Sequence, residues 1–350
     1  MVTKKIWRGG MIGAGAWSEI QLNAWAGVKN AEIVALCDRH PERRDPIVER
    51  FGIPRAFDDF ETMLDEADLD FIDICTRPYS HAALIKLAAG RGFPVLCQKP
   101  FCESLEEARE VSEFCDQTGV RLMINENFRW QSWYRKVKAL LNAGELGKPF
   151  FAKIHRRSRI SLPEFDHRQA YMQEMPRWAV YEVGVHYLDV FRFLFGDPDA
   201  IYCRLHRVSP HVAGEDVQVI TICYQDLTCL INQSFASVPV PGIDRPDDDN
   251  ADARRIPHGL QIDGAQGTLF LKPDRILHLY TDTGHQAWAF PEDTTQRSRA
   301  AAQQHFIDCL ESGGKFETDG PETLKTMALV YACYLSAEEG RVVSPDEILA

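Results

Sequence analysis

The chain has 350 residues, 45% of them hydrophobic and 26% charged, which is typical of a soluble globular protein of two domains. Its formal charge of −12, with no basic stripe, disfavours nucleic acid as a partner. No apolar run approaches the ~20 residues that span a bilayer, and the N-terminus lacks the apolar segment of a signal peptide, so we expect a cytoplasmic protein with no membrane contact.

Short apolar runs alternate with helical patterns over the first 125 residues. The apolar runs are residues 11–12, 33–37, 71–75, 94–97 and 121–124, and the helical patterns are 17–26, 42–51, 60–67, 81–89 and 105–117. This alternation predicts a parallel sheet with right-handed crossovers. Because the runs are apolar on both faces, helices should cover both sides of the sheet. We assign residues 1–127 to a doubly wound α/β domain.

The pattern changes in the rest of the chain. A helix is predicted over 130–143, a strand over 150–159 and a strongly apolar helix over 177–195. Between 200 and 280 several strand-like runs follow one another without long helices, which predicts a large, mainly antiparallel open sheet. Helices over 297–312 and 321–339 close the chain. We assign residues 128–350 to an α+β domain that binds substrate.

The first strand leads into the turn Gly13-Ala14-Gly15-Ala16-Trp17-Ser18, which opens a helix. Gly13 permits a tight turn, and Gly15 lets the backbone approach a pyrophosphate at the helix N-terminus. Ser18 stands where a third glycine is usual, and it is small enough for close packing of helix and strand. The turn predicts a Rossmann dinucleotide site. The alternative is a plain strand–turn–helix that binds no ligand.

Asp38 strengthens this prediction. It ends the second apolar run, 20 residues after Ser18, where an acidic residue binds the ribose hydroxyls of the adenosine. A carboxylate there favours NAD over NADP, since it repels a 2′-phosphate. Arg39 and Arg43 follow it and are able to bind that phosphate, so NADP stays open.

Three further segments carry a family resemblance. They are Cys75-Thr76-Arg77-Pro78-Tyr79-Ser80-His81, Cys97-Gln98-Lys99-Pro100 and Glu182-Val183-Gly184-Val185-His186. With the glycine-rich turn, they resemble the glucose–fructose oxidoreductase, inositol dehydrogenase and rhizopine-catabolism (Gfo/Idh/MocA) family of NAD(P)-dependent sugar oxidoreductases. The resemblance spans nearly the whole chain, and Cys97-Gln98-Lys99-Pro100 together with residues 126–131 is most similar to the apiose dehydrogenases.

The resemblance implies a set of cofactor-binding residues at the ends of the first strands. They are Gly13, Gly15, Ala16, Trp17, Ser18, Asp38, Arg39, Thr76, Arg77, Pro78, His81, Gln98, Lys99 and Asn127. Three positions depart from the family pattern: Arg77 replaces a proline, Gln98 a glutamate and Glu182 an aspartate. The resemblance also implies a homo-oligomer, a dimer or tetramer, that associates through the open sheet.

Lys99, His186 and Glu182 are the predicted catalytic residues, with Glu182 orienting or polarising His186. Lys99 follows an apolar strand at the sheet edge where ligands bind, and by resemblance it lies beside the nicotinamide, where an ammonium stabilises developing negative charge. His186, with an ordinary pKa near ~6.5, suits a general base. Glu182 precedes it by four residues on the same helix face, with Asp189 three residues further on. A structural Glu–His pair and an exposed strand-end lysine are the alternatives. We also predict that the Lys99–Pro100 peptide bond is cis.

The substrate is predicted to be a small carbohydrate. Trp130, Tyr171, Arg177 and Trp178 join Glu182 and His186 as candidate contacts, with ordinary packing as the alternative for each. The leading function is oxidation of a sugar, lactol or polyol by hydride transfer to nicotinamide. An NAD-dependent glycosidase of the same fold, without net redox change, and a non-catalytic dinucleotide sensor remain open.

Ten cysteines are spread along the chain without a CxxC pair or zinc-like spacing with histidine. We therefore expect no metal site. Several cysteines lie in apolar runs, where a reduced thiol behaves as a small hydrophobic side chain.

Overall fold

The computed structural model describes residues 5–159, 167–238, 240, 259–290 and 294–350. The chain folds as two units: Met1–Trp130 with Asp293–Leu324, and Gln131–Glu292 with Lys325–Ala350. The first break lies close to the boundary predicted after residue 127. The segment 293–324, which the sequence analysis placed in the second domain, belongs instead to unit 1.

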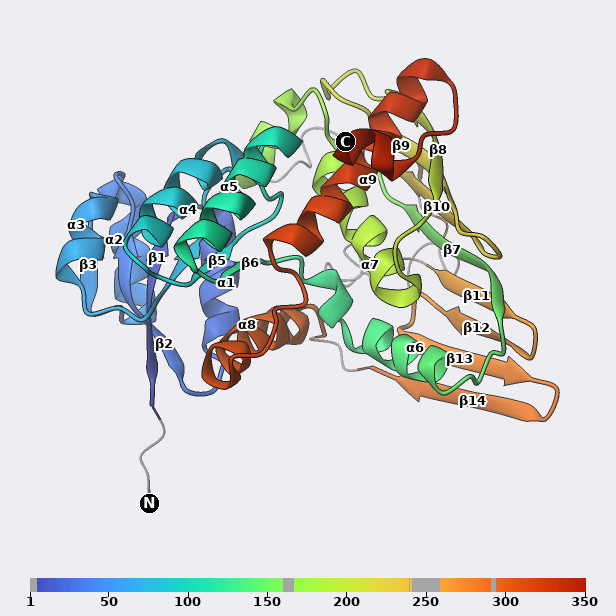
Figure 1. The fold of residues 1–350 in the computed structure, drawn as a ribbon, viewed down its shortest axis with the longest axis horizontal. Coiled ribbons are helices and arrows are strands. Elements are labelled where there is room, and N and C mark those ends of the chain that lie inside the picture. The colour runs from blue at the N-terminus through green and yellow to red at the C-terminus, as the bar shows by residue number, and fades with distance from the viewer. Residues whose placement is uncertain (1–4, 160–166, 239, 241–258, 291–293) are drawn as a thin grey trace. The chain divides into compact units, whose positions relative to one another are not determined.

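Unit 1 contains a parallel six-stranded sheet in the order β3-β2-β1-β4-β5-β6 (Figure 1). Its strands are β1 Trp7–Ile12, β2 Ala31–Cys37, β3 Arg55–Phe57, β4 Phe71–Ile74, β5 Val95–Cys97 and β6 Leu122–Ile124. The linking helices are α1 Ala16–Trp25, α2 Pro41–Phe51, α3 Phe60–Glu66, α4 His81–Gly90 and α5 Leu105–Thr118. This confirms the predicted doubly wound fold. The short edge strand β3 was missed because its three residues form no apolar run.

Helix α8, Thr294–Ser312, completes the core of unit 1. With right-handed crossovers, α1 and α2 cover one face of β1, β2 and β3, so the same face of β4, β5 and β6 needs another cover. Phe306 of α8 packs there against Phe71, Leu96 and Met123, with the Phe71 and Phe306 rings 5.5 Å apart. Burial of this apolar strip explains why a segment far along the chain returns to the first unit.

Unit 2 is built on an eight-stranded sheet in the order β14-β13-β12-β11-β7-β10-β9-β8. Among the described strands of this sheet only β10 and β7 pair in parallel, so the mainly antiparallel sheet is confirmed. The strands are β7 Pro149–Arg157, β8 Ala200–His206, β9 Val217–Cys223, β10 Thr228–Ser234, β11 Leu260–Gly264, β12 Gly267–Leu271, β13 Ile276–Thr281 and β14 Gly284–Ala289.

The helices after β6 are mostly those predicted. They are α6 Ser132–Asn142, α7 Val185–Phe195, α9 Gly320–Glu339 and the short α10 Pro345–Leu349, with 3₁₀ turns at Phe128–Trp130 (η2) and His167–Glu174 (η3). Among the described helices, none combines the length and apolarity that crossing a bilayer requires. All ten cysteines lie in described segments as free thiols.

Candidate active site

The glycine-rich turn has the form that a phosphate-binding turn needs. Gly13 has a φ of +106°, and a Cβ there would lie 2.2 Å from the carbonyl oxygen of Cys75, so only glycine fits. Gly15 has an ordinary φ of −82°, and a Cβ there would meet no atom within 4 Å. Open space therefore lies beside the backbone where α1 begins, the position at which a helix N-terminus attracts phosphate.

Ser18 forms two hydrogen bonds with Gly15 of this turn. It is fully buried, and its Oγ accepts a hydrogen bond from the Gly15 amide at 3.1 Å. The Ser18 amide donates in turn to the Gly15 carbonyl oxygen at 3.0 Å. Ala16 and Trp17 open α1 beside it, and the Arg299 guanidinium lies 5.0 Å from the Trp17 ring centre. The serine thus takes the place of the third glycine and packs the helix against the strand.

Asp38 lies at the end of β2 and is joined to the turn. Its Oδ2 accepts a hydrogen bond from the Ala14 amide at 2.8 Å, and its Oδ1 accepts one from the His40 amide at 2.9 Å. Arg39 is exposed, and its Nε donates to His40 Nε2 at 3.2 Å. The two bonds fix a negative charge beside the phosphate turn, which favours NAD.

His81 organises the loops after β4 and β5. Its Nδ1 lies 3.0 Å from the Pro100 carbonyl oxygen and 3.1 Å from that of Phe101, and its Nε2 lies 3.2 Å from the Thr76 carbonyl oxygen. Burial lowers the pKa of His81, so the ring is neutral at neutral pH. The ring is fully buried between the loops that carry Thr76 and Pro100, and its contact with a cofactor stays a prediction.

The predicted cis bond between Lys99 and Pro100 is confirmed. Just before it, Gln98 is 4% exposed, and its buried Nε2 makes no hydrogen bond with any of the described residues. A buried amide donor without a partner costs about 1–3 kcal/mol, so this atom fits a ligand hydroxyl. Together with the open space at Gly15 and the fixed carboxylate of Asp38, Gln98 makes this edge of unit 1 fit a dinucleotide.

The other predicted cofactor residues of unit 1 also follow its strands. Thr76 comes after β4, and its Oγ1 lies 2.7 Å from Ser80 Oγ. Arg77 and Pro78 begin the short 3₁₀ turn η1, Pro78–Ser80, and Asn127 is buried after β6. Because the sheet is parallel, these positions share one edge with Asp38 and Lys99. The strand order reverses at that edge, between β1 and β4.

In unit 2, the predicted helix 177–195 is not a single α-helix. Its first part, Ala179–Gly184, is a π-helical turn (η4), and α7 begins only at Val185. Glu182 therefore lies in the π turn and His186 in the first α turn, and both are largely buried at 7% and 6% exposure. Such turns are frequent at functional sites. The side-chain pattern of an apolar helix does not reveal them.

A buried carboxylate anchors the start of the π turn. Glu215 accepts hydrogen bonds from the amides of Trp178 at 3.2 Å and Val180 at 3.0 Å. The Tyr334 hydroxyl donates to the same carboxylate at 2.7 Å and accepts from the Tyr181 amide at 3.3 Å. These bonds satisfy amides that a helix N-terminus leaves open. The sequence analysis did not identify Glu215 or Tyr334, since neither belongs to a local motif.

The candidate sugar contacts divide between the units. Trp130 lies in unit 1, with its ring centre 4.5 Å from that of His305, and Tyr171 lies half-buried in η3 of unit 2. The Arg177 guanidinium, also in unit 2, lies 5.2 Å from the centre of the Tyr334 ring.

Trp178, by contrast, is buried in a core cluster of unit 2, with its ring centre 4.9 Å from that of Phe235. Its position favours the packing alternative.

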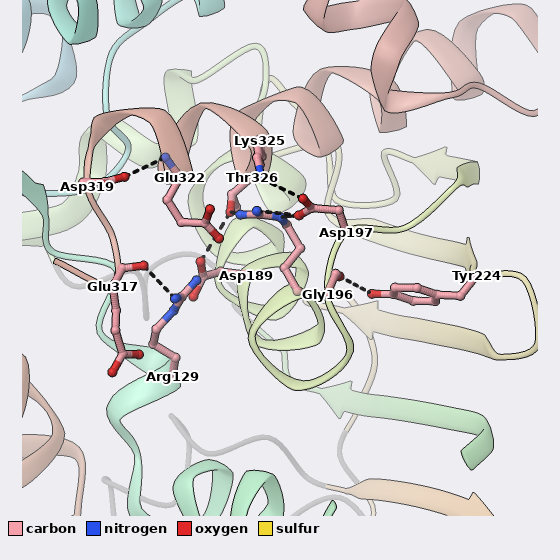
Figure 2. A network of polar contacts seen from close by, with 11 residues as sticks. Arg129, Asp189, Gly196, Asp197, Tyr224, Glu317, Asp319, Glu322, Lys325 and Thr326 are labelled. Carbon is pink, nitrogen blue, oxygen red and sulfur yellow. Dashed lines mark hydrogen bonds and ion pairs between the residues drawn. The ribbon is translucent and has the colours of Figure 1, made fainter. Parts of the chain in front are cut away.

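Asp189, the third acidic or basic residue of the predicted helix face, joins a structural network (Figure 2). Its Oδ1 accepts from the Thr326 hydroxyl of α9 at 3.3 Å, and Arg192 donates to the same hydroxyl at 2.8 Å. Asp197 binds both Arg192 at 2.6 Å and Lys325 at 2.8 Å. These bonds join α7 to α9, so Asp189 serves the fold while Glu182 and His186 remain the candidates for chemistry.

Comparison with known proteins decides the family. A family model described as an oxidoreductase family with an NAD-binding Rossmann fold matches residues 7–126, and the GFO/IDH/MocA C-terminal domain matches residues 134–269. The chain belongs to the Gfo/Idh/MocA family. This Gfo/Idh/MocA protein is therefore an NAD(P)-dependent oxidoreductase.

Two D-apiose dehydrogenases and one solved structure are similar to nearly the whole chain. The D-apiose dehydrogenase of Paraburkholderia graminis is 39% identical, over 97% of this chain and 90% of its own. The D-apiose dehydrogenase of Rhizobium rhizogenes is 36% identical, over 98% of both chains. The crystal structure of an oxidoreductase from Agrobacterium radiobacter in complex with NAD+, L-tartaric acid and magnesium matches this Gfo/Idh/MocA protein with a TM-score of 0.88 and 34% identity. The match covers 98% of this chain and all of the other.

Proposed function

We propose that this oxidoreductase is a D-apiose dehydrogenase that oxidises the lactol carbon of the sugar to a lactone. The observation that carries the proposal is the similarity of the whole chain to two D-apiose dehydrogenases. The open space at Gly15, the carboxylate of Asp38 and the amide of Gln98 support it, because together they fit a dinucleotide. Lys99 and His186 also support it, since oxidation of a hydroxyl requires a cation beside the oxygen and a general base.

In this proposal each chain residue has one task. His186 accepts the proton of the lactol hydroxyl and later releases it to solvent. Lys99 donates a hydrogen bond to the same oxygen and stabilises the negative charge that develops on it. Glu182 orients the His186 ring. NAD+, when bound, accepts the hydrogen of the reacting carbon as a hydride.

The cofactor is held by unit 1. The backbone amides of Ala16 and Trp17 at the start of α1 would bind the pyrophosphate, Asp38 would bind the adenosine ribose, and Gln98 Nε2 would donate to a hydroxyl on the nicotinamide side. The bond from Ala14 already orients Asp38 in this structure, so less ordering remains for binding. The cytoplasmic location stays a prediction from the apolar pattern of the sequence, and the homo-oligomeric state stays a prediction from the family resemblance.

A substrate screen tests the proposal. The purified protein is mixed with NAD+ or NADP+ and with D-apiose, D-xylose, myo-inositol or an apioside, and NADH or NADPH absorbance and free sugar are both measured. We expect kcat/KM to be highest for D-apiose with NAD+. Lys99→Met serves as the inactive control. Release of sugar from the apioside without net NADH would contradict the proposal and favour the glycosidase. Cofactor binding without turnover of any sugar would favour the sensor.

A further inference from the structure

Two neighbouring strand ends of unit 1 carry opposite charges at matching positions. In the parallel pairing of β5 and β6, Cys97 is level with Ile124. The Asn125 amide extends this ladder by donating to the Cys97 carbonyl oxygen at 2.7 Å. Lys99 and Glu126 each lie two residues beyond the last paired residue of their strands. Since both strands end at the same edge, the two side chains leave the backbone at neighbouring points.

Glu126 is buried among positive charges. It is 2% exposed, and burial raises the pKa of its carboxyl to about 7, while Lys99, Arg129 and the amide of Phe128 counter part of that rise. A hydrogen bond from Arg129 Nη1 to the Glu317 carbonyl oxygen, 2.9 Å long, holds the Arg129 side chain (Figure 2). A carboxylate removed from water is stable only when paired, so the two cations account for an acid at this position.

The Glu126 carboxylate gains importance because the residue directly before Lys99 is the neutral Gln98. The family pattern has a glutamate directly before the lysine, and here that position is neutral. We infer that Glu126 is the positioning carboxylate of Lys99, supplying from the end of β6 the negative charge that Gln98 lacks. This role rests on the proposed function, in which Lys99 binds the reacting oxygen. Glu126 holds the ammonium in place and balances its charge; it does not touch the substrate.

Substitution of Glu126 tests this role against a purely structural one. For Glu126→Gln we expect kcat to fall about 10²-fold, as for a displaced catalytic group, with the Kd for NAD+ unchanged. Protonation of Glu126 should lower activity in the native protein, so Glu126→Gln should remove one titration from the acid limb of its pH profile. Asp73→Asn is the matched control, since Asp73 is an equally buried carboxylate of unit 1, bound to Gln21 and Trp25, and should leave kcat and the acid limb unchanged.

Moving the charge gives a rescue that a structural role would not. Glu126→Asp should recover part of kcat, because it keeps the carboxylate. The double variant Gln98→Glu/Glu126→Gln places the carboxylate on the other side of Lys99 and should recover at least about tenfold in kcat over Glu126→Gln. Native kcat and an unchanged acid limb in Glu126→Gln would overturn the inference, as would failure of both rescues in folded protein.

Infrared titration separates this inference from the proposed function. The carboxylic acid C=O band of Glu126 should titrate with a midpoint near the pKa of about 7 and be absent in Glu126→Gln. Lys99→Met should move the midpoint upward, because it removes the cation that favours ionisation. An unmoved midpoint would overturn the pairing even in an active enzyme. If the protein oxidises no sugar, the proposed function fails, and the infrared result still decides whether Glu126 serves Lys99.

Discussion

Replacing Gly15 with alanine should separate cofactor binding from folding. The backbone at Gly15 is in an extended conformation that any residue adopts, and a methyl group there would meet no protein atom within 4 Å. Alanine also reduces the freedom of the unfolded chain, so we expect Gly15→Ala to stabilise the apo protein by about 0.4–1 kcal/mol. The methyl group would nevertheless fill the space that the pyrophosphate needs. We expect at least a tenfold rise in the Kd for NAD+, about 1.4 kcal/mol.

Gly13 should give the opposite result. Its φ of +106° costs an alanine about 1–3 kcal/mol in backbone strain alone. The added Cβ would also overlap the Cys75 carbonyl oxygen at 2.2 Å. We therefore expect Gly13→Ala to lower the melting temperature of unit 1, by about 2–4 °C for each kcal/mol of stability lost.

Thermal unfolding of the apo proteins and calorimetric titration with NAD+ measure both effects. Gly119→Ala is the control, since Gly119 caps α5 at a positive φ of 68°, at the sheet edge opposite the candidate site. It should lose about 1–2 kcal/mol of stability while NAD+ affinity is kept. If Gly15→Ala binds NAD+ like the native protein, the dinucleotide does not approach this turn and the assignment of the edge is refuted.

Three further predictions follow from single side chains. Asp38→Ala should raise the ratio of kcat/KM with NADP+ to that with NAD+ at least about tenfold, and an unchanged ratio would show that Asp38 does not select the cofactor. His186→Asn should lower kcat about 10²–10⁴-fold with the melting temperature nearly unchanged, whereas a lower melting temperature with native kcat would favour the structural Glu–His pair. Burial raises the pKa of Asp73 from 3.8 to about 6, so the folded state holds its proton more tightly and stability should fall by about 3 kcal/mol as the pH rises from about 4 to above 6. Urea unfolding should show this fall and its absence in Asp73→Asn; the same fall in the variant would assign it to other groups.

The residues at the carboxyl ends of the unit 1 strands could be located from the sequence because the patterns that mark them are local. A glycine with positive φ, a small residue at position 18 and an acid at a strand end each follow from short-range geometry. The alternation of apolar runs and helices placed these residues at one sheet edge without any long-range information. His81 was found by the same pattern, but the pattern does not reveal that its ring is buried with three carbonyl oxygens within 3.2 Å of its nitrogens.

The features that the sequence did not reveal depend on contacts between distant segments. The π turn at Ala179–Gly184 is anchored by Glu215 and Tyr334, which lie 35 and 153 residues from the amides they bind at Val180 and Tyr181. The placement of α8 in unit 1 follows from an apolar strip on strands far earlier in the chain. Glu126 offered one overlooked signal, its position two residues beyond a strand end, matching that of Lys99.

Oxidation of a sugar with net transfer of hydride to NAD+ can be followed with D-apiose deuterated at its anomeric carbon. NADH and lactone are measured together in the same reaction. We expect one reduced cofactor for each lactone, slower turnover than with the protonated sugar, and recovery of the deuterium at C4 of the nicotinamide. Sugar consumed without reduced cofactor, or deuterium released into water, would contradict this expectation.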